Sequence, residues 1–346
     1  MKTTLRVSPF QRGVSLIELM VALIIGLFLI FGAVTIYQQS RTTFRTTEAV
    51  ARLQEVARLA FDVLESDVRM ASYWGLNNRA EFIVNRGFPG LSTPSPFSTG
   101  QAAIISACGT VTNSNWAINL DQYIGGTNGG FGLAAGCGAF QGAATSGDML
   151  VVRRAADAQP AQLDGNRIYL QTSRIQGTLF VPVAGGGCDT PMLPTDPDCI
   201  PAAYAPPASQ SRQLVVHAYY VSTRSTFRND VPSLRRKSLG NINASSAADA
   251  FTDEEIVPGV EDMQVRFGVD TNGDTNVDQY VDPGAVPGGA AVMSATIWLR
   301  IRSEERDFSH VDGTTYSYAG VTTAAPNDNY RRIVVSKTIM LRNTRV

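Results

Sequence analysis

The chain has 346 residues, and its 29 Lys and Arg against 30 Asp and Glu give a formal net charge of −1 at pH 7. This balance excludes the broad positive potential with which proteins attract nucleic acid, so no nucleic-acid partner is predicted. Only 17% of the residues are charged and 31 are Gly, a composition typical of a loop-rich domain outside the cytoplasm.

The chain begins with a short cationic leader, residues 1–13. The leader carries Lys2, Arg6 and Arg12 and no acidic residue, which favours a cytoplasmic N-terminus. The apolar run that follows, residues 14–37, contains a single charge, Glu18. At a rise of about 1.5 Å per residue, about 24 helical residues cross a hydrocarbon core of roughly 30 Å. The sequence therefore predicts one membrane-spanning helix over residues 14–37.

Gly13 and Glu18 distinguish this run from an ordinary signal or anchor. A carboxylate at the centre of a membrane costs roughly 2.5–3.5 kcal/mol, so it normally has a partner and a function. A secretory signal is cut after its apolar stretch, whereas Gly13 precedes the stretch and a cut there leaves the helix on the mature chain. This arrangement resembles the type IV prepilins, which include pilins and the pseudopilins of type II secretion. A single-pass anchor with an incidental glutamate is the alternative.

The resemblance to prepilins implies a role for three residues. A prepilin peptidase would cut after Gly13, the new α-amine of Val14 would be methylated, and Glu18 at the fifth mature position would guide assembly. Val14 departs from the Phe that usually comes first in the class. We expect Glu18 of one subunit to pair with the Val14 amine of its neighbour, because pairing offsets the desolvation of both charges.

The helix is predicted to continue through residues 38–75. No Pro or Gly occurs from Gln38 to Tyr73, and Gly75 is a suitable end. Apolar residues recur at helical spacing, in a stripe that contains Leu53, Val56, Ala57, Ala60, Leu64, Val68 and Ala71. The stripe lacks a strict heptad repeat, so we expect it to pack on a β-sheet rather than in a coiled coil.

Residues 76–346 are predicted to form a β-rich globular domain outside the cytoplasm. Apolar and polar residues alternate over 263–269 and 293–302, as in half-buried antiparallel strands. Further strands are expected at 149–153, 167–171, 213–221, 235–239 and 331–342. The stretches 88–147 and 183–211 are rich in turn-forming residues and are expected to be long loops. The predicted fold class is α+β, with a long N-terminal helix packed on a meander-like antiparallel sheet.

All four cysteines fall in the exported part of the chain: Cys108, Cys137, Cys188 and Cys199. An oxidising compartment would allow two disulfides, and four cysteines allow three connectivities. We favour Cys108–Cys137 and Cys188–Cys199, because each pair closes one of the loops. Zinc binding is the alternative, but no CxxC spacing occurs and only two histidines are available, His217 and His310.

The C-terminal half carries a second resemblance. Its elements are Val-Asp-Thr-Asn-Gly-Asp at 269–274, Trp-Leu-Arg-Ile-Arg-Ser at 298–303, and the segment from Arg331-Arg332 to Leu341-Arg342-Asn343. Together with the N-terminal pattern they resemble the PilW family of minor pilins. The resemblance implies a type IV pilin-like fold and a low-abundance subunit that primes pilus assembly near the fibre tip and supports twitching motility.

The same resemblance implies the partners and the location. The partners would be the prepilin peptidase, other minor pilins, the major pilin, a tip adhesin and the inner-membrane assembly platform. The chain would span the bacterial inner membrane once before assembly, with its domain facing the periplasm. After assembly it would lie in the pilus fibre or at its tip on the cell surface.

One loop suggests a cation site. Oxygen side chains occur at every second position, in the rhythm of an EF-hand calcium loop: Asp270, Asn272, Asp274, Asn276 and Asp278. The match is incomplete, because the sixth position is Thr275 rather than Gly and the twelfth is Val281 rather than Glu. A solvated hairpin turn rich in Asx residues is the alternative. No cofactor is required by the sequence, and calcium with a structural role is the one that it suggests.

The sequence contains no motif for catalysis, since GxSxG, a phosphate loop and HExxH are all missing. We therefore predict that the chain is not an enzyme. A minor pseudopilin of type II secretion is the nearest alternative to a minor pilin. A surface binding module on a pilin-like anchor is the alternative of another class, and its marker would be ligand binding by the domain from Asn77 onward.

Overall fold

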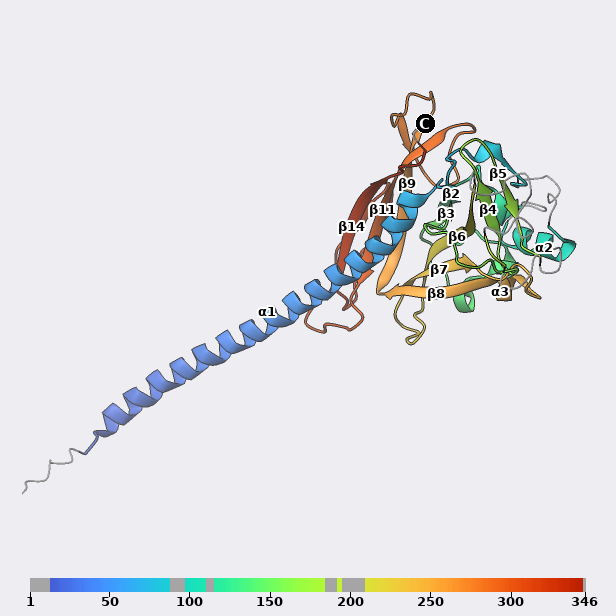
Figure 1. Cartoon of the computed structure of the whole chain (residues 1–346). Helices are drawn as coiled ribbons and strands as arrows, with labels where there is room; N and C mark the ends of the chain where they lie inside the picture. Colours follow the sequence, from blue (N-terminus) through green and yellow to red (C-terminus); the bar gives the residue numbers. More distant parts are fainter. Residues whose placement is uncertain (1–12, 88–96, 110–114, 184–191, 195–208, 345–346) are drawn as a thin grey trace, which may run out of the picture. The chain divides into compact units, whose positions relative to one another are not determined.

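The computed structural model describes residues 13–87, 97–109, 115–183, 192–194 and 209–344. The chain divides into two compact units, Met1–Ala51 and Arg52–Val346. One long helix, α1 (Leu16–Met70), contributes its first part to the first unit and its last part to the second (Figure 1). The prediction of a long N-terminal helix followed by a β-rich domain is confirmed.

The helix α1 ends earlier than the sequence predicted. Its last residue is Met70, not one near Gly75. Ser72 adopts a left-handed conformation with φ 62°, and its N–H donates to the carbonyl of Arg153 at 3.4 Å. The carbonyl of Tyr73 then accepts from the N–H of Ala155 at 2.6 Å. The backbone groups of Ser72 and Tyr73 thus bond to the strand β3 (Met149–Ala155) rather than to the helix. The helix therefore ends before Gly75.

An eight-stranded sheet forms the larger part of the second unit. Its strands are β1 (Ile83–Val84), β2 (Ile124–Thr127), β3 (Met149–Ala155), β4 (Tyr169–Thr172), β5 (Gly177–Phe180), β6 (Gln210–Ser222), β7 (Ser233–Leu239) and β8 (Phe251–Pro258). The order is β1-β5-β4-β6-β3-β2, with β7 paired to both β6 and β8. All the pairs are antiparallel except β1 with β5, which is parallel.

A second, four-stranded antiparallel sheet follows in the chain. It has the order β10-β9-β11-β14 and comprises β9 (Val260–Asp270), β10 (Gln279–Val281), β11 (Ala291–Arg302) and β14 (Arg332–Met340). A hairpin of β12 (Tyr316–Tyr318) and β13 (Val321–Thr323) forms a separate pair. The expected strands thus exist, but the expectation of one meander-like sheet is wrong.

The chain crosses from the first sheet to the second at Gly259. It stands between β8 and β9 with φ 91°, a conformation that side-chain-bearing residues rarely adopt. A Cβ atom there would lie 3.1 Å from the carbonyl oxygen of Arg302. The tight turn therefore depends on glycine, and it lets two strands that are adjacent in sequence belong to different sheets.

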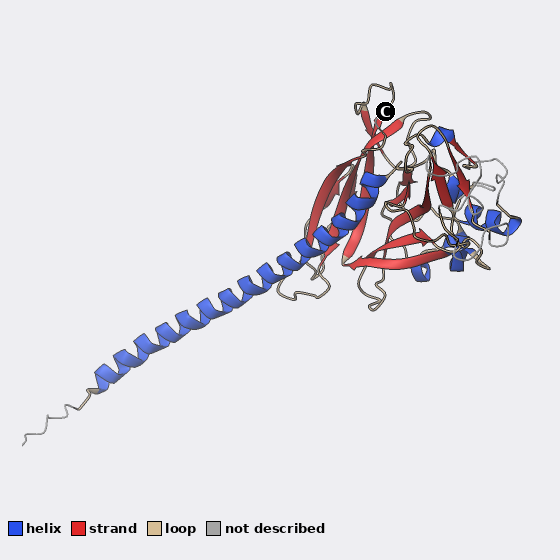
Figure 2. Ribbon diagram, viewed as in Figure 1, coloured by secondary structure: helices blue, strands red, loops and turns tan. Residues whose placement is uncertain are grey.

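Figure 2 shows the strands and helices of the second unit. Its two large apolar clusters lie on opposite faces of the large sheet. Along β6 the side chains alternate between them: Tyr219 and Val221 join the first cluster, whereas Val216 and Tyr220 join the second. The first cluster includes the buried stripe of α1 and the inner face of the four-stranded sheet. The expected packing of the amphipathic helix on a sheet is confirmed.

The stretch 88–147 is not only loop. It contains α2 (Thr99–Ala107) and β2, along with 3-10 turns at Trp116–Ile118, Ala135–Cys137 and Phe140–Gly142; another lies at Ala80–Phe82, and a short helix α3 (Ala247–Ala250) precedes β8. Ser98 and Gln101 form a capping box at the start of α2, a helix-start signal that the Gly-rich surroundings obscured.

One of the two predicted disulfides lies in the described part of the chain. Cys108, which caps the end of α2, is bonded to Cys137. Both sulfurs are buried in the second apolar cluster. The pair Cys188–Cys199 lies outside the described residues.

Candidate assembly site

The N-terminal pattern is exposed in the structure. Gly13 and Val14 precede the helix, and Val14 is 70% exposed. A Cβ atom at Gly13 would meet nothing within 4 Å. Among the described residues, no side chain covers Gly13.

Glu18 lies in the first turn of α1. The carbonyl of Ser15 accepts the N–H of Leu19 at 3.1 Å, which closes that turn. A negative charge is favoured there, because the first N–H groups of a helix carry partial positive charge. Among the residues that the structure describes, Glu18 forms no ion pair.

A continuous apolar surface surrounds Glu18. Leu16 is 77% exposed, Phe28 71% and Phe31 70%, and large apolar side chains remain exposed as far as Tyr37. By length and composition α1 can cross a membrane, and it is the one such helix among the residues described. Apolar surfaces of this size indicate contact with lipid or with other protein chains.

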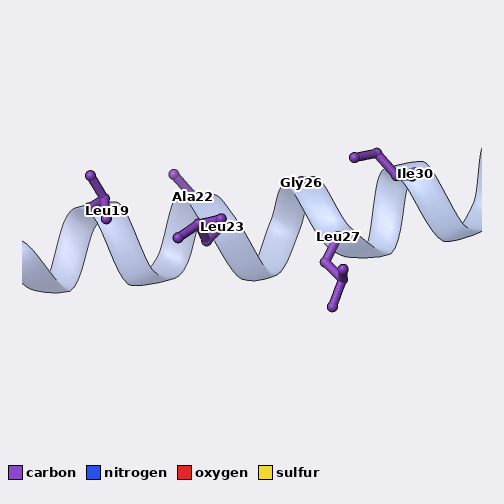
Figure 3. Close-up of a pocket in the computed structure, with 6 residues that line it drawn as sticks. All are labelled: Leu19, Ala22, Leu23, Gly26, Leu27 and Ile30. Carbon is purple, nitrogen blue, oxygen red and sulfur yellow. The ribbon is translucent and has the colours of Figure 1, made fainter.

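Gly26 leaves a shallow notch in this surface (Figure 3). It is lined by the neighbouring turns of the same helix: Leu19, Ala22, Leu23, Leu27 and Ile30. No atom lies within 4 Å of where a Cβ of Gly26 would stand. A second apolar helix could therefore approach the backbone here more closely than at the neighbouring large side chains.

At the other end of α1, Asp67 anchors the helix to the large sheet. Its side chain is 2% exposed, and it accepts hydrogen bonds from Arg154 on β3 at 2.8 and 3.0 Å. The Tyr219 hydroxyl on β6 donates to it at 2.5 Å, and the Nδ1 atom of His217, also on β6, contacts the same carboxylate. Three side chains from two strands thus converge on one helical carboxylate.

These contacts determine the ionisation of Asp67. Burial alone would raise its pKa, but the hydrogen bond and charge of His217, the charge of Arg154 and the hydrogen bond of Tyr219 outweigh it. The pKa of Asp67 is therefore held below its ordinary value. Asp67 is ionised at neutral pH, and the three side chains that contact it offset the cost of burying its charge.

A second set of contacts joins α1 to β14. Lys337 of β14 pairs with Glu65, which also pairs with Arg69 one turn further along. The amide of Asn343, just after β14, donates to the carbonyls of Arg69 and Ala71 at 3.3 and 3.2 Å. The end of the helix is therefore attached to both sheets.

The Asp- and Asn-rich loop forms a hydrogen-bonded turn. The carboxylate of Asp270 accepts the N–H groups of Asn272, Gly273 and Thr275 at 2.7–3.0 Å, and these bonds lower its pKa although burial would raise it. Asp278 accepts both the N–H and the hydroxyl of Thr271 at 2.8 and 2.7 Å.

In the structure the carboxylates of this loop accept hydrogen bonds from donors of the loop itself, as in an Asx turn. No group of three or more His, Cys, Asp or Glu able to hold a metal ion occurs within the described residues. Calcium binding by Asp270, Asn272, Asp274, Asn276 and Asp278 stays a prediction of the sequence.

The predicted site residues and the anchoring residues differ in how visible they are in the sequence. Gly13, Val14 and Glu18 were found because they interrupt or border an apolar run. Asp67 was missed, although its position between Leu64 and Val68 in the apolar stripe was a signal. Its partners Arg154 and His217 lie far away in the chain, and the sequence gives no sign that they meet it.

Comparison with known proteins gives two matches. Residues 218–343 match the family described as Type IV Pilus-assembly protein W, and residues 9–34 match the Prokaryotic N-terminal methylation motif. The second match contains the leader end, the first residues of α1 and Glu18. No curated protein and no solved structure matches the chain.

Proposed function

We propose that the chain is a pilin of the PilW type that primes assembly of the type IV pilus, because its C-terminal region matches the PilW family and its N-terminus carries the methylation motif. In this proposal it is a minor subunit that supports twitching motility and works with other minor pilins, the major pilin, a tip adhesin and the assembly platform. The observation that carries the proposal is the isolated Glu18, five residues after Gly13 on an exposed apolar helix.

The proposed mechanism begins in the inner membrane. A prepilin peptidase cuts the exposed bond after Gly13 and releases the α-amine of Val14, which becomes methylated. The apolar part of α1 keeps the chain in the membrane with its domain in the periplasm. In that state Glu18 is a costly charge, because a carboxylate within a bilayer is normally paired.

Assembly then supplies the missing partner. Glu18 of this chain approaches the N-terminal amine of a neighbouring subunit as their apolar helices pack together. The ion pair offsets the desolvation of both groups and favours one axial register of the helices over others. The apolar surface of α1 exchanges lipid contacts for protein contacts, so specificity comes chiefly from the charged pair.

The direct test is the variant Glu18→Ala, placed in a strain that lacks the wild-type gene. The variant should be processed and inserted in the membrane as usual. Its amount in sheared pili should fall at least about tenfold, since losing an ion pair worth more than about 1.4 kcal/mol changes an equilibrium by that factor. Wild-type amounts in the fibre and normal twitching would overturn the role of Glu18.

Two matched variants interpret that result. Glu55→Ala removes an exposed carboxylate from the same helix beyond the apolar run, and it should leave assembly unchanged. Gly13→Glu should block cleavage, which appears as a slower band on a gel. If deletion of the gene abolished protein secretion and left pili intact, the chain would instead serve type II secretion.

A further inference from the structure

The edge of the four-stranded sheet is the feature that the assembly site does not use. The last strand, β14, pairs only with β11 and forms the outer rim of this sheet (Figure 1). We propose that the free edge of β14 is a strand-pairing site, on which a different pilin-type subunit adds an extended segment. This proposal rests on the proposed function, because it identifies a contact through which the chain would join other pilins.

The outward-facing backbone groups of β14 follow from its register. Just beyond its two ends, Leu341 donates to the carbonyl of Met293 at 3.0 Å, and Ser303 donates to that of Arg331 at 2.8 Å. The register between the two strands is regular throughout, and hydrogen-bonded pairs alternate along an antiparallel ladder. The even-numbered residues therefore direct their N–H and C=O groups away from β11: Arg332, Val334, Ser336, Thr338 and Met340.

Among the described residues, no backbone hydrogen bond uses these outward groups. They form a row of alternating donors and acceptors along a strand of nine residues. Such a row is a template for another strand, and main-chain bonds supply the affinity in this mode of recognition. The chemistry of the site thus selects an extended peptide backbone as its ligand.

Natural proteins usually protect a long edge with charge, proline or a bulge. The strand β14 has no proline and no register shift, and both of its cations are already neutralised. Arg332 is 1% exposed, and its guanidinium pairs with the carboxylates of Glu261, Asp312 and Asp328 at 2.7–3.0 Å. Lys337 is paired with Glu65. Neither cation of the strand is therefore left without a carboxylate partner.

The other edges that the structure describes are short or protected. The strand β10 has three residues, β1 has two and β2 has four, so none of them offers a long template. The strand β8 has a register shift against β7 and ends on Pro258, and a bulge and a proline are two of the usual protections of an edge. Among the described strands, β14 is the long edge that lacks such a device.

The direction of β14 limits what can occupy it. One end of the four-stranded sheet lies beside Val56, whose Cγ1 is 3.9 Å from where a Cβ of Gly259 would stand. The other end lies beside Arg69, because Asn343, which follows β14, donates a hydrogen bond to the carbonyl of Arg69. The strand therefore runs in the same sense as the last turns of α1. Two copies paired antiparallel about a two-fold axis would have these helical segments pointing in opposite directions, which a shared membrane forbids.

A second copy in the same orientation is not a suitable occupant either. It would offer its opposite edge, where β10 spans three residues. The edge of β9 beyond β10 is in use, because the carbonyl of Met263 accepts the N–H of Asp148 at 2.7 Å. The occupant is therefore a pilin-type subunit of another sequence that has a free extended strand.

The test is a proline substitution in the full-length chain. The variant is expressed in the native bacterium in place of the wild-type protein. Ser336→Pro removes one outward N–H and no bond to β11, and edge positions of this kind tolerate proline. Ser336→Ala is the matched control, since it keeps that N–H. We expect both variants to be processed and to reach the membrane. The proline variant should be recovered from sheared pili at least tenfold less than the control.

A double variant decides the question if Ser336→Pro is degraded. Ser336→Lys with Thr338→Lys keeps every backbone bond and places two charges beside the edge, and it should also be lost from pili. Equal recovery of the proline variant and its alanine control, or of the double-lysine chain and wild type, overturns the proposal. If Glu18→Ala reaches pili as well as wild type does, the Glu18 mechanism fails. The proposal for the edge of β14 is then still decided by the Ser336 and Thr338 variants.

A photo-crosslinker identifies the occupant directly. Met340 is 43% exposed and lies at the free edge, so we place p-benzoylphenylalanine there and identify adducts by mass spectrometry. A cross-link to another protein with an N-terminal methylation motif supports the proposal, and Ser336→Pro should abolish it. A cross-link only within the chain, to a second copy, or to no protein at all overturns it, whether or not the wild type is found in pili.

Discussion

Asp67 shows how one side chain can decide the attachment of a helix. It is buried, ionised and contacted by Arg154, His217 and Tyr219 from two strands. Burying a carboxylate is unfavourable unless its partners remain in place, and removing one member of such a set leaves the others uncompensated. The stability of the helix–sheet contact should therefore be unusually sensitive to this position.

Asp67→Ala should lower the free energy of unfolding by about 3–5 kcal/mol, because it leaves the partly buried Arg154 and His217 without their anion. The control is Asp62→Ala on the same helix, where the carboxylate is 63% exposed and lies 4.0 Å from Arg58. That change should cost less than about 1 kcal/mol. Urea unfolding of the purified chain in detergent measures both, and equal losses would show that Asp67 does not anchor the helix.

Asp67 should also make stability depend on pH. Its pKa in the folded state lies below the unfolded value of about 3.9. The carboxylate therefore stabilises the fold fully above that value, and the contribution is lost as the pH falls toward the folded-state pKa.

Asp67→Asn removes this titration, so the stability difference between wild type and variant should be largest near pH 7 and shrink toward pH 3. Unfolding curves at pH 7, 5 and 3 measure it. A difference that is constant or grows on acidification would contradict the assigned ionisation.

At the scale of the element, the two faces of α1 should respond differently to the same substitution. Leu64 is 0% exposed and Leu59 is 47% exposed. Leu64→Ala should lower the free energy of unfolding by about 2–5 kcal/mol through lost burial and a cavity. Leu59→Ala should change it by less than about 0.5 kcal/mol. If Leu59→Ala proved the more damaging change, the packed face of the helix would have been misassigned.

The disulfide between the end of α2 and the 3-10 turn Ala135–Cys137 should stabilise the domain appreciably. Cys108 and Cys137 are separated by 29 positions in sequence, and closing a loop of this length is worth about 3–4 kcal/mol. The double variant Cys108→Ser with Cys137→Ser should lower the urea midpoint accordingly. Reductant should lower the midpoint of the wild type more than that of the variant, which keeps Cys188 and Cys199, and an insensitive wild type would rule out the bond.

The elements that sequence could predict are those with a simple period. The helix of 55 residues and the strands β9 and β11 follow directly from helical and alternating apolar patterns. The division into two sheets could not be predicted, because it depends on the turn at Gly259 and on pairings between distant strands. The charges of β7 and β8 were a usable signal: Arg235, Arg236 and Lys237 lie opposite Glu255, Glu254 and Asp253.

The candidate assembly site was predictable for a related reason. Gly13 and Glu18 are local departures from an apolar run, so their positions alone carry the information. The anchoring of α1 and the free edge of β14 are tertiary properties. They require knowledge of which strand lies beside the helix and which strand ends the sheet, and neither follows from periodicity.

At the scale of the whole molecule, the chain combines two different parts. One is an apolar helical segment that needs contact with lipid or with other proteins, and the other is a domain that buries its own apolar side chains. The apolar residues of α1 up to Tyr37 are exposed, whereas its stripe from Leu53 onward is buried in the domain. The charge at Glu18 lies in the exposed part, and the free edge of β14 lies in the domain. The molecule therefore offers separate contacts for the helical and the globular parts of a fibre.

Mass spectrometry of sheared and purified pili tests the central claim most directly. The account predicts that peptides of this chain are present in the fibre and that its N-terminal peptide begins at Val14 with a methylated amine. The peptide should disappear from fibres made with Glu18→Ala. Absence of the wild-type chain from the fibre, or its presence there with residues 1–13 still attached, would contradict the account.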